Sequence, residues 1–445
     1  MIIEVKDVQN FVDSFETAKS VLPGTAIPWL MSLREQGAAR FAGLGLPTRK
    51  VEAWKYTDLS ALRQTRWRGV GAEEGAARID FIPSLFPAEV PRFRLVFVHG
   101  RARPDLWLVG DVPPEVTIGS LAGALNAPSA AVEGSLGRIA TDERQPLLSL
   151  NTALMEDGFV VRIGSGVRLA EPLEVVFIGG MAAEAVAYHP RNLVIVEEGS
   201  SLTLVEHHVG IGGGAYFANS VTELEVRDEG HLRRYVLQSE GDQGLYLETV
   251  HAEVGRDATL EAFGLASGGR LARSEISVRL DGPGARCVLA GAYVCRGKQV
   301  CDNTTLIEHR APNTTCREVF KGVLDDAARG VFQGCIVVHR GARNADGHQL
   351  SKALLLSDAA EIDQKPELRI FADEVKCSHG AAAGQLDHDA LFYLRTRGLR
   401  EDAARRLLIE AFLADAFEEI SEERVKHAML AAVADWFAVG GGAER

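Results

Sequence analysis

The fold is decided by four segments that recur between residues 197 and 291: EEGSSLTLVEHH (197–208), RDEGHLRRYVLQ (227–238), VGRDATLEAFGL (254–265) and LDGPGARCVLAG (280–291). Each is a turn rich in Gly, Asp or Glu followed by a run that favours a β-strand. Their first strand residues, Leu202, Leu232, Leu260 and Cys287, lie 30, 28 and 27 residues apart. A repeat of this length is typical of stacked supersecondary units, each of which needs its neighbours to bury its apolar face.

Short β-rich runs alternate with turns from about residue 158, and no helical period occurs for over a hundred residues. Stacked units without helices favour a right-handed parallel β-helix, a solenoid in which every coil adds strands to the same sheets. A β-sandwich is the alternative, since it also uses many short strands and frequent turns. We therefore predict a mainly β protein with a β-helix core flanked by helical regions at both ends.

The pattern divides the chain into an N-terminal helical region with a linker (1–90), the β-helix core with an irregular entry segment (91–385) and a C-terminal helical domain (386–445). In the last of these, Asp387 is placed to cap a first helix, and two amphipathic helices follow it. The final coil of a solenoid exposes strand edges and apolar side chains. We expect the C-terminal helices to cover that coil.

The formal charge of −13 argues against nucleic acid as a partner, because phosphate binding needs a basic surface. Acidic residues stand near the N-terminus, where a signal peptide needs basic ones, and no apolar run approaches the length of a membrane span. We therefore expect a cytoplasmic protein that does not bind a membrane. In that reducing compartment the six cysteines are expected to be free thiols.

The triplet Cys-Ser-His at 377–379, which ends a strand-like segment, is the main candidate for metal chemistry. Side chains two residues apart leave an extended strand on the same face, so Cys377 and His379 are predicted to point the same way. A thiolate beside an imidazole suits iron, zinc or sulfur-transfer chemistry. A tetrahedral site or a cluster usually takes four ligands, so the others would have to come from a partner.

Nucleotide hydrolysis is not expected of this chain. The segment GAYVCRGKQ (291–299) is the nearest approach to a phosphate-binding loop. Five residues separate its glycines instead of four, and Gln299 stands where Ser or Thr is required. We predict no catalytic residues and no enzymatic activity.

Four segments resemble the SufB/SufD family of the SUF iron–sulfur cluster assembly system, in particular its SufD branch. They are RKVEAWKYTDL (49–59), FKGVLDDAARGVFQG (320–334), ALLLSDAAEIDQK (353–365) and EIDQKPELRIFADEVKCSHGAAAGQLDHDALFYLRTRGL (361–399). Together they extend the resemblance from about residue 45 to about residue 420, with little of it between 70 and 150. It implies the same fold, a β-helix core flanked by helices.

The resemblance also implies a non-catalytic scaffold subunit that pairs with a SufB-like paralogue and binds a SufC-like ABC-type ATPase. Cys377 and His379 match family residues near the contact with SufB, which implies a transient iron–sulfur cluster shared with that partner. The segment that would bind the ATPase, together with the basic cluster after it, includes Tyr393, Leu394, Arg395, Arg397, Leu399, Arg405 and Arg406. A homodimer of the isolated chain is a further expectation. The alternatives are a SufB-like subunit and a polysaccharide-active β-helix enzyme, although the repeat region has few aromatic residues for binding sugars.

Overall fold

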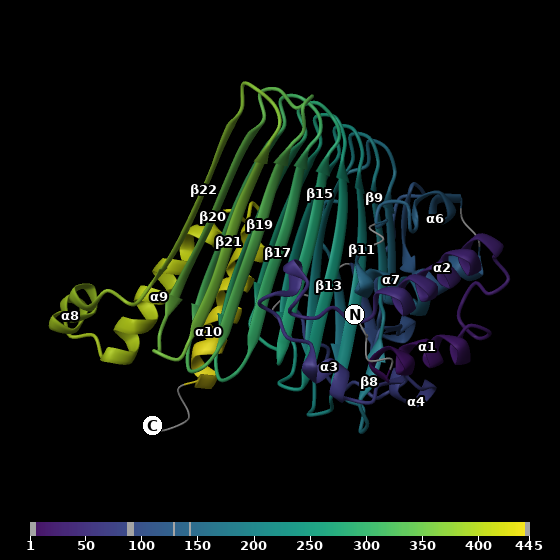
Figure 1. Ribbon diagram of the computed structural model, residues 1–445, viewed down its shortest axis with the longest axis horizontal. Coiled ribbons are helices and arrows are strands. Elements are labelled where there is room, and N and C mark those ends of the chain that lie inside the picture. Colours follow the sequence, from purple (N-terminus) through teal and green to yellow (C-terminus); the bar gives the residue numbers. More distant parts are fainter. Residues whose placement is uncertain (1–5, 87–92, 128–129, 142–143, 441–445) are drawn as a thin grey trace.

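Two parallel β-sheets face each other in the centre of the molecule, and the chain passes back and forth between them as a solenoid (Figure 1). The computed structural model describes residues 6–86, 93–127, 130–141 and 144–440. Each coil adds one strand to each sheet, so core strands that pair with each other are usually two apart in chain order. The parallel solenoid predicted from the repeat is confirmed, and its parallel pairing excludes the β-sandwich.

The strands of the first sheet, sheet A, are, in the order in which they pair, β21 (Glu361–Ile370), β19 (Arg329–Val338), β17 (Val300–His309), β15 (Leu271–Leu280), β13 (Gly244–Val254), β11 (Tyr216–Val226), β9 (Arg191–Val196), β6 (Phe159–Ile163) and β5 (Val116–Ser120). Those of sheet B are β22 (Lys376–Gly384), β20 (Asp346–Leu355), β18 (Thr315–Leu324), β16 (Arg286–Cys295), β14 (Thr259–Ala266), β12 (His231–Ser239), β10 (Ser201–Gly210), β7 (Leu173–Gly179), β2 (Phe93–Val98) and β3 (Arg101–Ala102). Three short strands pair beside these paths, namely β1 (Arg68–Gly69), β4 (Leu108–Val109) and β8 (Val186–Tyr188).

The repeat in the sequence is the register of sheet B. Leu202 pairs with Leu232, Leu232 with Leu260, and Leu260 with Cys287. A typical coil has two strands of about 10 residues, one in each sheet, so the strands are longer than the short β-rich runs of the sequence suggest. The period of 27 to 30 residues is therefore the length of one complete coil.

One corner of successive coils is turned by a residue with positive φ. These residues are Gly199, Glu229, Asp257, Gly284, Asn313, Asn344 and Glu374. The N–H of Glu229 donates to the carbonyl of Arg256, and that of Asp257 donates to the carbonyl of Pro283, so each corner is bonded to the next. Gly, Asn and Asp tolerate this backbone conformation better than other residues. The recurring turn signals in the sequence have this physical origin.

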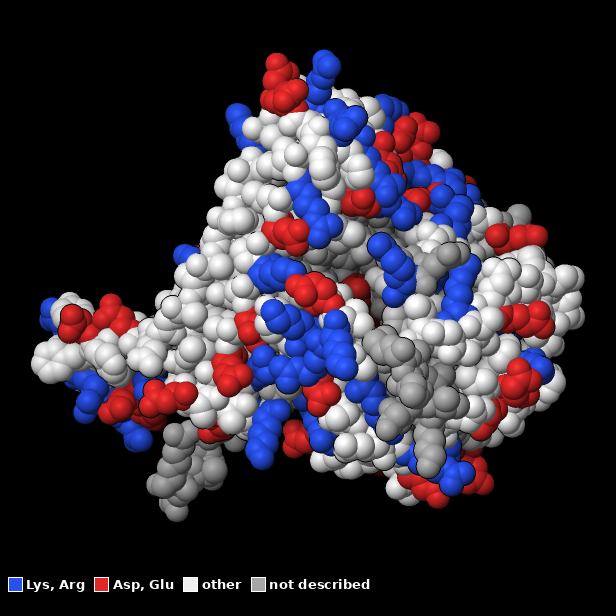
Figure 2. Space-filling model, viewed as in Figure 1, with Lys and Arg blue, Asp and Glu red and all other residues white. Residues whose placement is uncertain are grey.

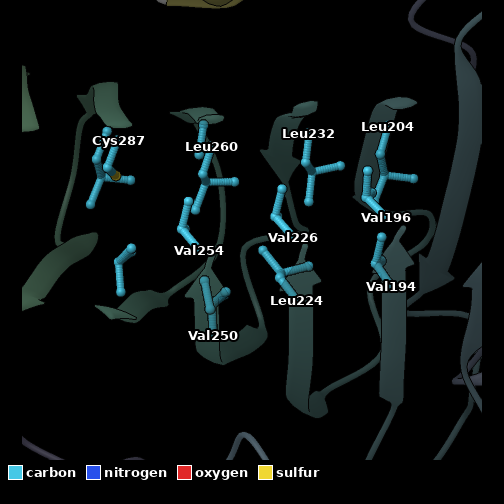
Figure 3. Packing of buried hydrophobic residues seen from close by; sticks show 14 of the residues in the cluster. Val194, Val196, Leu204, Leu224, Val226, Leu232, Val250, Val254, Leu260 and Cys287 are labelled. Carbon is cyan, nitrogen blue, oxygen red and sulfur yellow. The ribbon is translucent and has the colours of Figure 1, made fainter. Parts of the chain in front are cut away.

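The main core lies between the two sheets, where side chains at alternate strand positions point inward (Figure 3). Leu204, Leu232 and Leu260 come from sheet B and face Val226 and Val254 of sheet A, and each of them is almost fully buried. Every coil buries its inward side chains against both neighbouring coils, which is how a solenoid forms one continuous core.

The N-terminal region packs on the outer face of sheet A (Figure 1). Its helices, together with those of the entry segment, are α1 (Lys6–Ala18), α2 (Pro28–Leu44), α3 (Ser60–Gln64), α4 (Ala72–Gly75), α5 (Leu121–Asn126), α6 (Ala130–Ser135) and α7 (Pro146–Leu154), with short 3-10 turns at Glu52–Trp54 and Pro104–Leu106. The guanidinium of Arg273 lies 4.0 Å from the ring centroid of Trp54 and bonds Asp302, which also accepts a hydrogen bond from Thr57. The motif at 49–59 therefore fastens the N-terminal region to β15 and β17. The predicted boundary at residue 90 lies outside the described residues.

The C-terminal region has three helices, α8 (His388–Thr396), α9 (Glu401–Phe417) and α10 (Glu423–Gly440). As predicted, the Asp387 side chain caps α8, accepting from the backbone N–H groups of Asp389 and Ala390. Helix α9 lies along the outer face of β16 and β18, and the apolar residues of α9 and α10 pack on that face of sheet B. The expectation that these helices cover the last coil is wrong: every residue of β22 is exposed or only half-buried. The outer face of sheet B is itself apolar, with Tyr235 and Phe263 on it, and this is the face that the helices bury.

Polar groups interrupt the apolar interior towards the C-terminal end of the solenoid. Glu318 is 1% exposed, and it accepts hydrogen bonds from Thr305 Oγ1 and Gln349 Nε2, both at 2.5 Å. Its burial raises the pKa of the carboxyl group to about 7, although both hydrogen bonds oppose the shift.

Glu318→Gln tests this shift. Between pH 4.5 and 7 the folded chain holds a proton on Glu318 that the unfolded chain releases, so the contribution of this group to stability falls as the pH rises. We expect the unfolding free energy of the variant, relative to the unsubstituted protein, to increase by up to about 3 kcal/mol across that window. Denaturant unfolding at a series of pH values measures the difference. A difference that is independent of pH would mean that the carboxyl keeps its ordinary pKa.

Candidate functional site

The last coil, formed by β21 and β22, has open edges. Among the described residues, β22 pairs only with β20, and β21 pairs only with β19. At the other end of the solenoid, antiparallel strands close the sheets: β5 pairs with β6, and β3 and β4 pair with β2. The two ends therefore differ, and only the C-terminal end presents long parallel strands with unpaired backbone groups.

Cys377 and His379 both lie in β22, two residues apart, with Gly347 and Gln349 as their neighbours in β20. Cys377 is half-buried and packs against the core between the sheets, so this face of β22 is the inward one. His379 is exposed because no further coil follows it. Burial raises the pKa of the Cys377 thiol, and a hydrogen bond with the Gly347 backbone opposes that effect.

Two further thiols occupy the positions that correspond to Cys377 in earlier strands of sheet B. Cys287 pairs with Cys316, and Gly347 separates Cys316 from Cys377. The Cys316 Sγ lies 3.1 Å from His309 Nε2, and both groups are almost fully buried. Burial raises the pKa of Cys316 well above its usual value and lowers that of His309 to about 4. The pair is therefore uncharged at neutral pH, and it packs as a buried thiol–imidazole hydrogen bond.

The described residues contain no group of three or more His, Cys, Asp or Glu side chains arranged to hold a metal ion. Cys377 and His379 thus offer one sulfur and one nitrogen ligand at an open edge, which is half of the usual set of four. Chemically, this arrangement suits one half of a metal or cluster site shared with a second chain.

Helix α8 projects from the same end of the molecule as β22 (Figure 1). None of its side chains is buried, and Tyr393 is 56% and Phe392 69% exposed. Leu399 follows the helix and Leu407 lies on α9, and both are exposed too. An exposed cluster of large apolar side chains of this kind is typical of a protein-binding surface.

The predicted basic residues surround this apolar cluster. Arg397 donates to the Tyr393 hydroxyl at 3.0 Å, and Arg395 and Arg406 pair with nearby glutamates. Leu394 and Arg405 are half-buried. Figure 2 shows both signs of charge on this projecting region, and few charged side chains along the adjacent margin of the solenoid. Sequence reasoning missed Phe392 and Leu407, although the FYL run at 392–394 marks the position of Phe392.

Within the described residues, no helix is both long enough and apolar enough to span a membrane.

Comparison with known proteins places most of the chain in one family. A family model described as the SufBD core domain of the SUF system for FeS cluster assembly matches residues 177–412, and a model of the SufBD protein N-terminal region matches residues 5–175. The iron–sulfur cluster assembly protein SufD of Escherichia coli is 31% identical over 87% of this chain and 89% of its own length.

Two further relatives are similar over most of their length. An iron–sulfur cluster assembly SufBD family protein of Synechocystis is 29% identical over 90% of each chain. The chloroplastic protein ABCI7 of Arabidopsis thaliana is 26% identical over 94% of this chain and 88% of its own length. With a core model that matches more than half of its residues, the chain belongs to the SufBD family of iron–sulfur cluster assembly proteins.

Proposed function

We propose that this protein is a SufD-like scaffold subunit of a cytoplasmic iron–sulfur cluster assembly complex, without catalytic activity of its own. Its open end pairs with a SufB-like chain, and its C-terminal helices bind a SufC-like ATPase. The observation that supports this best is the uncovered last coil with Cys377 and His379 on it. The family match indicates that the chemistry is iron–sulfur cluster assembly, and the relative from Escherichia coli is itself named SufD.

Pairing at the open end follows from the backbone. β21 and β22 are 10 and 9 residues long and leave one side of each strand without a partner strand in the described residues. A chain that adds a strand to such an edge gains a full row of main-chain hydrogen bonds. A SufB-like solenoid would extend both sheets at once, and in its absence a second copy of this chain would use the same edge.

Iron and sulfide are the substrates of the scaffold. In the proposed complex, Cys377 and His379 ligate a nascent cluster, and the partner across the edge supplies the remaining ligands. Because the cluster lies between two chains, any movement that opens their contact exposes it for release. The ATPase that drives such a movement binds the surface around Tyr393 and Leu399, to which α9 and β22 are directly connected in the chain.

A polysaccharide-active enzyme, the alternative from the sequence, has no support among the family matches, which together span residues 5–412. A SufB-like subunit is less favoured than a SufD-like one because the relative from Escherichia coli, which matches 87% of the chain, is named SufD.

Proline substitutions at Ala381 and Ala382 test the pairing edge. Neighbouring residues of a parallel strand direct their N–H groups to opposite sides, so one of the two faces β20 and the other the open edge. We expect one variant to lose more than tenfold in affinity for the SufB-like chain at unchanged melting temperature, and the other to lower the melting temperature. Analytical ultracentrifugation and thermal unfolding measure the two effects. Normal pairing by both variants would place the interface elsewhere.

Cys377→Ala and His379→Ala test the ligands. Each is expected to reduce cluster formation on the reconstituted complex at least tenfold without changing assembly of the subunits, since neither side chain is fully buried. Bound iron and sulfide, assayed after purification of the complex, give the result. Ser378→Ala is the matched control, because its side chain leaves the opposite face of the strand. Equal loss in all three variants would indicate a structural role for this strand end.

The double variant Phe392→Ala/Tyr393→Ala tests the ATPase surface. We expect the dissociation constant for the SufC-like ATPase to rise at least tenfold, because exposed aromatic side chains dominate such interfaces. The melting temperature should stay constant, as α8 buries none of its side chains. Arg405→Glu/Arg406→Glu should weaken the contact less and in a salt-dependent manner. Phe81→Ala, at an exposed position before the core, is the control; if it weakens binding as much as the double variant, the surface is wrongly assigned.

A further inference from the structure

Gln349 lies one rung behind His379 in the interior of the solenoid. It pairs with Glu318 of β18 on one side and with His379 of β22 on the other. All three residues occupy the inward face of sheet B, since Cys316 and Cys377, two positions before Glu318 and His379, pack against the core. Gln349 is 3% exposed, so its amide has no access to bulk solvent.

The orientation of the Gln349 amide follows from its neighbours. Its Nε2 donates to Glu318 Oε2 at 2.5 Å, while Thr305 Oγ1 donates to Oε1 of the same carboxyl group at 2.5 Å. With the NH2 group directed at Glu318, the Oε1 atom of Gln349 is the free end of the amide. That oxygen is buried and has no hydrogen-bond partner among the described residues. A buried acceptor without a partner costs about 1–3 kcal/mol, which makes a missing donor the feature to explain.

Gly334 of β19 provides the space for this arrangement. A Cβ atom at position 334 would overlap the Gln349 amide, so only glycine allows the amide to lie there. The Gln349 amide therefore lies between Glu318 and sheet A. His379 is the next residue after Gln349 in the same row of paired positions. Paired residues of neighbouring strands are separated by about 4.8 Å, so the imidazole lies within reach of a glutamine side chain.

We propose that Gln349 is a positioning residue for His379. In this structure the Gln349 Oε1 is unpartnered, and a turn of the exposed imidazole brings a ring N–H of His379 to donate to it. This inference rests on the proposed function only in giving His379 a ligand role. A neutral imidazole has one N–H and one lone pair, so fixing the N–H inward directs the lone-pair nitrogen to the open edge, where iron binds. Glu318, Gln349 and His379 then form a hydrogen-bonded file that sets both the tautomer and the orientation of the ring, as partners of metal-binding histidines commonly do.

The tautomer of His379 in the isolated full-length chain tests the proposal without any cluster. The protein is labelled with 15N in its histidine rings, and ring nitrogen shifts are recorded by NMR at a pH at which imidazole is neutral. His379→Gln identifies the signals. We expect one tautomer to exceed the other at least fivefold, and Gln349→Met, which keeps the length but lacks the acceptor, to reduce this ratio to about that of an exposed histidine. Gln349→Glu restores an acceptor and should restore the ratio.

An unchanged ratio in Gln349→Met would overturn the proposal. If that variant does not fold, Gln349→Asn withdraws the acceptor by one methylene and must lower the ratio as well. On the reconstituted complex, Gln349→Met should reduce cluster formation about tenfold, and Gln349→Glu should recover most of it. If the ratio changes as expected while His379→Ala forms clusters normally, the positioning stands and the ligand role of His379 fails.

Discussion

The in-register stacking of coils is the constraint on which the rest of this structure depends. Each strand satisfies its backbone groups only through the coils before and after it, and each inward side chain is buried only by the same neighbours. The two end coils therefore need separate solutions. At the N-terminal end the short antiparallel strands β3, β4 and β5 terminate the sheets. The C-terminal end has no equivalent among the described residues, and the proposed function uses its open strand edges as a surface for a partner.

The same stacking brings distant residues into line. A position in one strand meets residues about 30 positions away in the chain, so a file of side chains runs along the interior of the solenoid. One of these files is aliphatic in the early coils, at Leu202, Leu232 and Leu260, whereas the neighbouring file contains the buried Arg234, which is paired with Glu206 and Glu248. Near the open end the first file continues to Cys316 and Cys377, and the second to Glu318, Gln349 and His379. Polar groups in such a core are tolerated best where they are paired, and the Gln349 Oε1 is a buried acceptor without a partner that lies one coil before the exposed His379.

The outer faces of the sheets are used for packing of a different kind. Sheet A is fastened to the N-terminal region by Trp54, Arg273 and Asp302, so the motif around Trp54 has a structural role. Sheet B is covered by α9 and α10, with Lys321 reaching both the Phe412 carbonyl and Asp415. Because both outer faces of the middle coils are covered, the uncovered last coil and the projecting α8 remain for association. Both lie at one end of the molecule, so the ATPase of the proposed complex would bind close to the open edge.

Local sequence was sufficient for features that local chemistry decides. The spacing of Leu202, Leu232, Leu260 and Cys287 predicted the register, because turn residues with positive φ and strand-forming runs recur with each coil. The cap at Asp387 and the shared face of Cys377 and His379 also depend only on residues a few positions apart. Where α9 and α10 pack could not be predicted, because an apolar helix stripe fits any apolar surface, and only the folded solenoid shows that they pack on the apolar outer face of sheet B. The proposed contact between Gln349 and His379 could not be predicted from local sequence either. The two residues are 30 positions apart, and they become neighbours only when the last coil is stacked on the one before it.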